Sequence, residues 1–141
     1  MPKKNTSHLE NELKNSASLD NFLEEHQEEL AHRSLSEQLV AMLEAKGLTK
    51  AEVVKESNLN EVYAYQILSG VRRPSRDKLL SLCFAMKATL EETQGLLKQS
   101  GFAPLYARCH RDSIVIFALT HGHSIIQLNM DLYDHGEPVI E

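Results

Sequence analysis

The sequence of 141 residues has little of what builds disulfide frameworks or β-sheets. Its two cysteines, Cys83 and Cys109, do not form a CxxC pair, so neither a disulfide framework nor a thiolate zinc site is expected, and both are predicted to be reduced core residues. Tryptophan is absent and aromatic residues make up only 6% of the chain. Strand-forming runs are therefore scarce, and the composition favours an all-α fold.

Long apolar runs are also missing. No segment approaches the roughly 18 uncharged apolar residues that span a bilayer. The opening Met1-Pro2-Lys3-Lys4 continues into polar residues rather than into the apolar core of an export signal. The sequence therefore predicts a cytoplasmic protein with no part in the membrane.

Positive charge is scarce overall but concentrated in one place. The formal net charge is −5, and it divides into −3 for residues 1–33, +1 for residues 34–100 and −3 for residues 101–141. Within the middle segment, residues 70–78 hold four cations and one anion. This run can face phosphate although the whole chain is acidic, and a solvated loop is the alternative interpretation.

Apolar residues recur with helical spacing through most of the chain. Residues 1–17 are polar and predict a flexible tail. Residues 18–33 predict an amphipathic helix with one apolar stripe, formed by Leu19, Phe22, Leu23 and Leu30. Five short helices are expected within residues 34–100, at 34–46, 50–56, 61–69, 76–86 and 90–98. Between the second and third of them, Ser57-Asn58-Leu59-Asn60 predicts a tight turn with a left-handed Asn58, an apolar plug and an N-cap.

Residues 101–141 predict a C-terminal helical extension. Gly101 and Pro104 break the chain, and segments 107–120 and 124–134 read as a helical hairpin around Gly122. The run Ile114-Val115-Ile116-Phe117 also fits a buried strand, but no partner strand is visible in the sequence. We therefore expect a hairpin that either packs on the preceding domain or forms a dimer.

These helices carry a recognisable family pattern. Gly47-Leu48-Thr49-Lys50, Asn58-Leu59-Asn60, Gly70 and Arg73-Pro74-Ser75 stand where the lambda-repressor-like, Cro/Xre-type helix-turn-helix family has its motifs, and about half the chain resembles that family. The resemblance implies a five-helix DNA-binding domain of bacterial type, with a C-terminal helical extension. It also implies that the third helix lies in the major groove of double-stranded DNA.

The resemblance points to the start of the third helix as the surface that reads bases, namely Asn60, Glu61, Val62, Tyr65 and Gln66. Gln66 can bond an adenine edge, Glu61 can accept from cytosine and Val62 can meet a thymine methyl. Alternatively, Glu61 is explained by the helix dipole alone, and Val62 and Tyr65 by packing on another helix or a partner protein.

Phosphate contacts are expected from groups that flank this helix: Thr49, Lys50, Arg72, Arg73, Arg76 and Lys78. The planar guanidinium of arginine matches phosphate oxygens, and the helix after Ser75 adds the positive end of its dipole. For Arg76, the alternative is a surface ion pair with Asp77 that contributes little.

Neither a metal site nor an enzyme is expected. The seven histidines include His121 and His123, but no histidine or cysteine pair has the spacing of a closed zinc site. The chain has no Gly-rich phosphate loop, no HExxH and no nucleophile motif. No catalytic residue, metal ligand or cofactor is therefore predicted.

Taken with the resemblance, the sequence predicts a sequence-specific transcriptional regulator that represses by occupying a promoter. It is expected to be a homodimer built through two apolar surfaces. One is the stripe of residues 18–33, and the other is formed by the hairpin residues Ile114, Phe117, Ile125, Leu128 and Leu132. Two alternatives stay open. One is that both segments enlarge a monomeric core, and the other is a protein-interaction adaptor that keeps the fold and uses the 101–138 hairpin to bind a partner.

Overall fold

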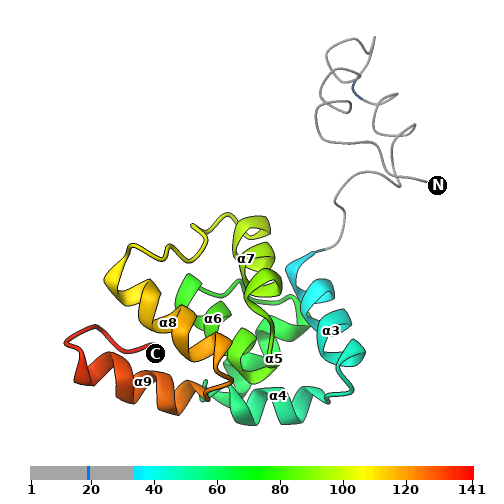
Figure 1. Ribbon diagram of the computed structural model, residues 1–141. Helices are drawn as coiled ribbons and strands as arrows, with labels where there is room; N and C mark the ends of the chain where they lie inside the picture. The colour runs from blue at the N-terminus through cyan, green and yellow to red at the C-terminus, as the bar shows by residue number, and fades with distance from the viewer. Residues whose placement is uncertain (1–18, 20–33) are drawn as a thin grey trace. The chain divides into compact units, whose positions relative to one another are not determined.

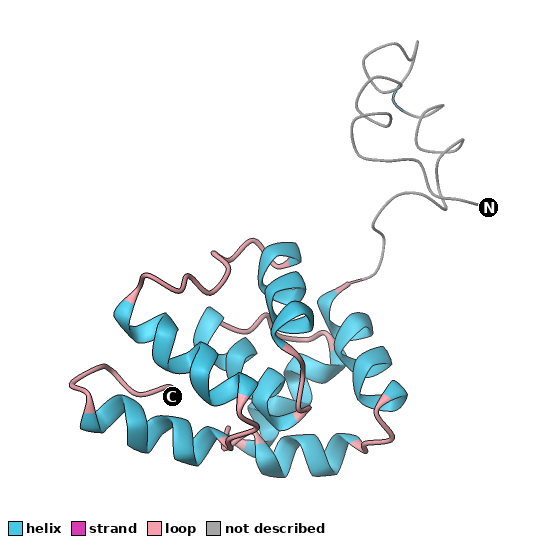
Figure 2. Cartoon of the chain, in the orientation of Figure 1, coloured by secondary structure: helices cyan, strands magenta, loops and turns pink. Residues whose placement is uncertain are grey.

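The computed structural model describes Leu19 and residues 34–141, which form only helices, turns and loops (Figure 2). Seven helices lie in this part: α3 (Leu35–Ala45), α4 (Lys50–Glu56), α5 (Glu61–Ser69), α6 (Arg76–Ala85), α7 (Leu90–Gln99), α8 (His110–Thr120) and α9 (Ile125–Asp134). The all-α prediction is confirmed for these residues. The predicted tail 1–17 and, apart from Leu19, the predicted helix 18–33 lie outside them.

Hydrogen-bonding caps fix where the helices begin. Six of the seven start after a Ser, Thr or Asn whose side chain accepts the backbone N–H three residues on: Ser34, Thr49, Asn60, Ser75, Thr89 and Ser124. The exception is α8, whose N-cap Cys109 makes no such bond. The sequence-predicted start of this helix at residue 107 was wrong, because Cys109 is extended and its N–H closes a turn onto the carbonyl of Tyr106.

The turn between α4 and α5 has the predicted conformation. Asn58 is left-handed with φ 59°, and the side chain of Asn60 accepts the N–H of Tyr63 at 3.1 Å. The buried Ser57 hydroxyl donates to the carbonyl of Val54 at 2.7 Å and accepts the N–H of Leu59 at 3.3 Å. Half-buried Leu59 packs on the core as the expected plug.

Helix α6 is the centre of the structure (Figure 1). Every residue from Leu79 to Ala85 is buried, and α4, α7 and α9 all pack against it. A helix without a polar face needs neighbours on all sides. Helix α9 supplies one of them, so the C-terminal hairpin of α8 and α9 completes the core around α6.

This packing corrects two predictions. Ile125, Leu128 and Leu132 were expected to form a dimer surface, but they are buried in the chain's own core. Cys83 is a free, fully buried thiol as expected, whereas Cys109 is free and exposed rather than a core residue. Among the residues described, no helix is long and apolar enough to cross a membrane.

Candidate nucleic-acid interface

Helix α5 has one buried face and one open face. Ala64, Ile67 and Leu68 are in the core. On the other side, Glu61 is exposed, Val62 is 65% exposed and Tyr65 is 37% exposed. Gln66 is half-buried beside them. Val62 and Tyr65 thus give this face of α5 an exposed apolar area beside the polar groups of Glu61 and Gln66.

Two hollows lie along the open face of α5. The first has a volume of about 410 Å³ and is lined by Lys50, Glu61, Val62, Tyr65, Gln66 and Ser69. The second has a volume of about 580 Å³ and is lined by Asn58, Leu59, Asn60, Val62, Tyr63, Gln66, Arg72, Lys78 and Glu141. Val62 and Gln66 line both hollows and so form the ridge between them. All five predicted base-reading residues thus line one hollow or both.

Three of the six predicted phosphate-contacting residues line these hollows. Lys50 lines the first hollow, next to Thr49, whose hydroxyl caps α4 and also donates to the Glu52 carboxylate at 3.0 Å. Arg72 and Lys78 line the second hollow. Each hollow therefore holds cationic side chains, with Lys50 beside Glu61 in the first and Arg72 and Lys78 beside Glu141 in the second, although the two cationic segments are more than twenty residues apart in the sequence.

Tyr63, which was not among the predicted site residues, organises the second hollow. The guanidinium carbon of Arg72 lies 5.7 Å from the centre of its ring, and the Lys78 ammonium lies 5.2 Å from it. Cations placed over an aromatic face are attracted by its negative charge density. The signal in the sequence was the position of Tyr63, three residues before Gln66, which puts both on neighbouring parts of one helical face.

Arg72 also bonds directly to a predicted base-reading residue. Its Nε donates to the carboxamide oxygen of Gln66 at 2.8 Å. Arg73, next in the chain, is exposed and points elsewhere, with a weak 3.4 Å bond to the carbonyl of Ser100. The two neighbouring arginines therefore have different surroundings.

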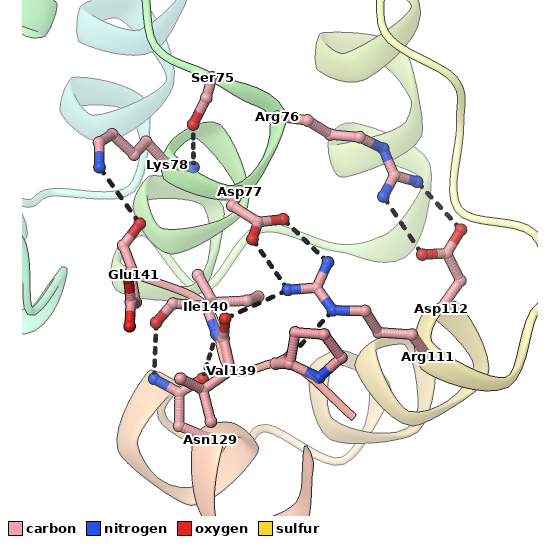
Figure 3. A network of polar contacts seen from close by, with 11 residues as sticks. Ser75, Arg76, Asp77, Lys78, Arg111, Asp112, Asn129, Val139, Ile140 and Glu141 are labelled. Atoms are coloured by element: carbon pink, nitrogen blue, oxygen red, sulfur yellow. Dashed lines mark hydrogen bonds and ion pairs between the residues drawn. The ribbon is translucent and has the colours of Figure 1, made fainter. Parts of the chain in front are cut away.

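Arg76 is held inside the molecule (Figure 3). Its guanidinium makes two bonds to the Asp112 carboxylate, at 3.0 and 3.2 Å, and two to the carbonyls of Ala103 and Pro104. Only 24% of its side chain is exposed, and only 9% of that of Asp112. Because its donors are engaged with the segment 103–112, we leave Arg76 out of the phosphate-contacting set.

The Arg76–Asp77 surface pair, considered as the alternative for Arg76, does not form, and the two residues take other partners. Asp77 accepts two bonds from Arg111, at 2.8 and 3.0 Å, while Arg76 bonds the neighbouring Asp112. Two Arg-Asp dipeptides, one in the first turn of α6 and one in the first turn of α8, are thereby cross-linked. The hydrogen bonds that Arg111 donates to the Asp77 carboxylate raise the pKa of Arg111 above its ordinary value.

Residues 138–141 are fixed against the same region (Figure 3). The Asn129 side chain both donates to and accepts from the backbone of Ile140, at 2.9 and 2.8 Å, and Arg111 donates to the carbonyl of Pro138 at 3.0 Å. Lys78 donates to the main-chain oxygen of Glu141 at 3.3 Å. An acidic residue thus lines the second hollow beside Arg72 and Lys78.

The candidate metal-binding side chains of the extension do not converge. His110 pairs with Glu137 at 2.6 Å, and His121 stacks on Phe117 with ring centres 3.9 Å apart. Within the part of the chain that the structure describes, no three His, Cys, Asp or Glu residues are grouped to hold a metal ion. The comparisons with known proteins add no assignment for the site: no family model matches this chain, and neither does any curated protein or solved structure.

Proposed function

We propose that this protein is a DNA-binding transcriptional regulator that reads duplex DNA with the open face of α5. The observation that carries the proposal is the ridge of Val62 and Gln66 between two hollows, with Lys50 on one side and Arg72 and Lys78 on the other. A helix that enters a groove meets a phosphate strand on each flank, so it needs this distribution of charge. The resemblance of residues 47–75 to Cro/Xre-type helix-turn-helix domains supports the same assignment.

Each group on this surface has a definite use on DNA. Lys50, Arg72 and Lys78 attract phosphates without regard to sequence, and each releases counterions when it does so. Val62 offers an apolar contact to a thymine methyl, and Gln66 offers hydrogen bonds to a base edge. Occupying a promoter in this way represses transcription by excluding the polymerase, which is the mechanism we propose.

Selection from a random duplex pool tests the proposal. The full chain, incubated with the pool at about 50 mM salt, is expected to enrich a defined sequence and to lose affinity steeply as salt rises, with a slope that counts the neutralised phosphates. The triple substitution Lys50→Ala, Arg72→Ala and Lys78→Ala should abolish the enrichment. A chain that enriches no sequence and binds duplexes no better than this variant would contradict the proposal.

A second function is favoured by apolar side chains left open on the hairpin. Phe117, Ile126, Met130 and Tyr133 are each more than half exposed. Together with Val62 and Tyr65 on α5, they support an adaptor that keeps the helix-turn-helix fold and binds a partner protein. Binding that is insensitive to salt, together with the absence of duplex enrichment, would favour the adaptor over the regulator.

We further propose that the regulator acts as a homodimer, because one α5 places few side chains on bases and two copies add their contacts. The buried residues Ile125, Leu128 and Leu132 are unavailable for this, so the open side chains of α8 and α9 remain for it. Sedimentation at tens of micromolar tests the dimer directly. A monomer under those conditions would exclude it.

A further inference from the structure

Arg72 and Gln66 are arranged as a unit before any DNA binds. The chain reverses after α5 at Gly70, which is left-handed with φ 86°. The main-chain N–H groups of Val71 and Arg72 then both donate to the carbonyl of Gln66, at 2.9 and 3.2 Å. This closure of the helix end brings the Arg72 side chain back beside that of Gln66.

The position of Gly70 makes this reversal rigid. A Cβ at residue 70 would lie 2.9 Å from the Ser36 hydroxyl oxygen, closer than real Cβ atoms approach other heavy atoms. Glycine is therefore favoured for its backbone conformation, and a Cβ at this position would also require the Ser36 hydroxyl to move. The placement of Arg72 thus depends on the packing of α3 against α5 and not on the loop alone.

The chemistry of the pair fixes the orientation of the Gln66 carboxamide. An arginine Nε–H only donates, so its partner at 2.8 Å must be the carboxamide oxygen and not the nitrogen. The carboxamide NH₂ is then the end of Gln66 left for an outside partner. The Tyr63 ring, which lies under the Arg72 guanidinium, helps to hold the arginine in place.

The remaining donors of Arg72 are open. In the part of the chain that the structure describes, its two Nη groups bond to no other protein atom, and the residue is exposed. Arginine can therefore hold Gln66 through Nε and meet a phosphate through Nη at the same time. Lysine does not provide this fixed geometry, because its three donors share one nitrogen at the end of a flexible stem.

On the proposed function, we infer that Arg72 is a positioning residue that sets base specificity: it holds the oxygen of Gln66 so that the NH₂ group faces the DNA and selects a keto base. Guanine presents O6 and N7 and thymine presents O4 as acceptors in the major groove, whereas cytosine presents the N4 amino donor and adenine presents its N6 amino donor beside the N7 acceptor. A carboxamide whose oxygen is held by Arg72 cannot accept from an amino group, so adenine offers it only N7, next to a like donor. This inference replaces both the adenine contact expected for Gln66 and the purely sequence-independent role expected for Arg72.

The experiment compares four full-length proteins by selection from a random duplex pool and by titration of the selected site and its single-base variants. They are the unaltered chain, Arg72→Lys, its matched control Arg73→Lys and Gln66→Glu. The unaltered chain should prefer a keto base at one position by about fivefold, the effect of one net hydrogen bond. Arg72→Lys should keep its charge and most of its overall affinity, but its preference at that position should fall below about twofold.

The other two proteins make the test specific. Arg73→Lys should leave the preference unchanged, because Arg73 does not touch Gln66. Gln66→Glu keeps an oxygen for Arg72 but replaces the outward donor by an acceptor, so its preference should move to an amino base.

Two results would overturn the inference while leaving the proposed function intact. One is a preference for adenine in the unaltered chain. The other is a loss of affinity in Arg72→Lys that is equal for all four bases at that position. Failure of the unaltered chain to enrich any sequence would instead overturn the proposed function and this inference together.

Discussion

Arg72 and Arg76 lie four residues apart in the chain, yet they belong to regions with opposite character. Arg72 is exposed on the open face of α5, where it holds one side chain and keeps donors free. Arg76 lies in the junction between α6 and α8, where a carboxylate and two carbonyls take up its guanidinium. The open face leaves donors of Arg72 without a protein acceptor, and the junction holds the extension onto the core.

The comparison teaches that a run of cations in a sequence does not define a binding surface by itself. Residues 70–78 contain four positive charges, but their surroundings sort them. Arg72 and Lys78 line a hollow beside α5, while Arg76 faces Asp112. Arginine donors that remain open are available to an outside acceptor, whereas those satisfied by the protein join parts of the chain to one another.

The largest effect is expected from breaking the junction. Asp112→Ala removes both bonds to Arg76 and the acceptor for the Tyr106 N–H, and leaves a partly buried guanidinium without its anion. The loss should be about 2–4 kcal/mol in the free energy of unfolding, near the lower end for removing one member of a buried pair. Urea denaturation measures it.

The control for that experiment is Asp134→Ala, which removes an exposed carboxylate at the end of α9 and should change stability by less than about 0.5 kcal/mol. Equal losses in the two variants would show that the junction contributes no more than the surface does.

The next largest loss of stability is expected from changing Gly70, the glycine that aligns Arg72. Gly70→Ala should destabilise the protein by about 1–3 kcal/mol, because alanine resists the left-handed conformation and its Cβ meets the Ser36 hydroxyl. Gly122→Ala is the matched control, with φ 71° and nothing within 4 Å of the added Cβ, so it tests the backbone effect alone.

Thermal unfolding of both glycine variants measures their losses of stability, and the difference between the two losses is due to the contact with Ser36. Adding Ser36→Ala to Gly70→Ala should recover most of that difference. If Gly70→Ala and Gly122→Ala lose the same amount, the close approach to α3 has no energetic weight.

A smaller effect is expected from one cation on the open face. Lys50→Ala should weaken binding to all duplexes about equally and reduce the salt slope by about 1, since Lys50 neutralises one phosphate. Lys55→Ala is the control, because Lys55 is exposed on the same helix but lines neither hollow. Titrations at several salt concentrations compare the slopes, and a change in base preference would assign Lys50 to recognition instead.

The smallest change in stability is expected from an exposed ion pair, which can be compared with the more buried pair of Arg76 and Asp112. Lys46 and Glu92 also lie 3.0 Å apart, but 35% of the Glu92 side chain is exposed, against 9% for Asp112. The Thr89 N–H and then the Lys46 ammonium lower the pKa of Glu92. Stability from this carboxylate is therefore present above its unfolded pKa, near 4.5, and is lost as the pH falls through the lower folded value.

In Glu92→Gln, stability should consequently fall less steeply as the pH drops below about 4.5. At pH 7 the substitution should change stability by less than about 1 kcal/mol, because exposed ion pairs are screened. Urea midpoints measured from pH 3 to 7 test this. A loss at pH 7 as large as that of Asp112→Ala would mean that exposure does not separate the two pairs.

Local signals in the sequence predicted most of the helices. The capping residues, such as Asn60 and Thr89, and the left-handed Asn58 act within a few residues of themselves, so their effect can be read without knowing the fold. Helix α8 was placed too early because its first turn has no capping side chain and depends on distant contacts. The residues of the candidate site were predicted from the sequence. The role of Tyr63 and the bond between Arg72 and Gln66 were not.

The sequence by itself determined that residues 34–134 form short helices, most of them capped, with a tight turn before α5, because propensity, caps and apolar spacing are local properties. Only the tertiary structure decided which partners the charged residues take. The exchange between Arg76–Asp112 and Arg111–Asp77 joins segments more than thirty residues apart. It depends on how α8 and α9 complete the core around α6, and this packing is what leaves Arg72 open while Arg76 is bound.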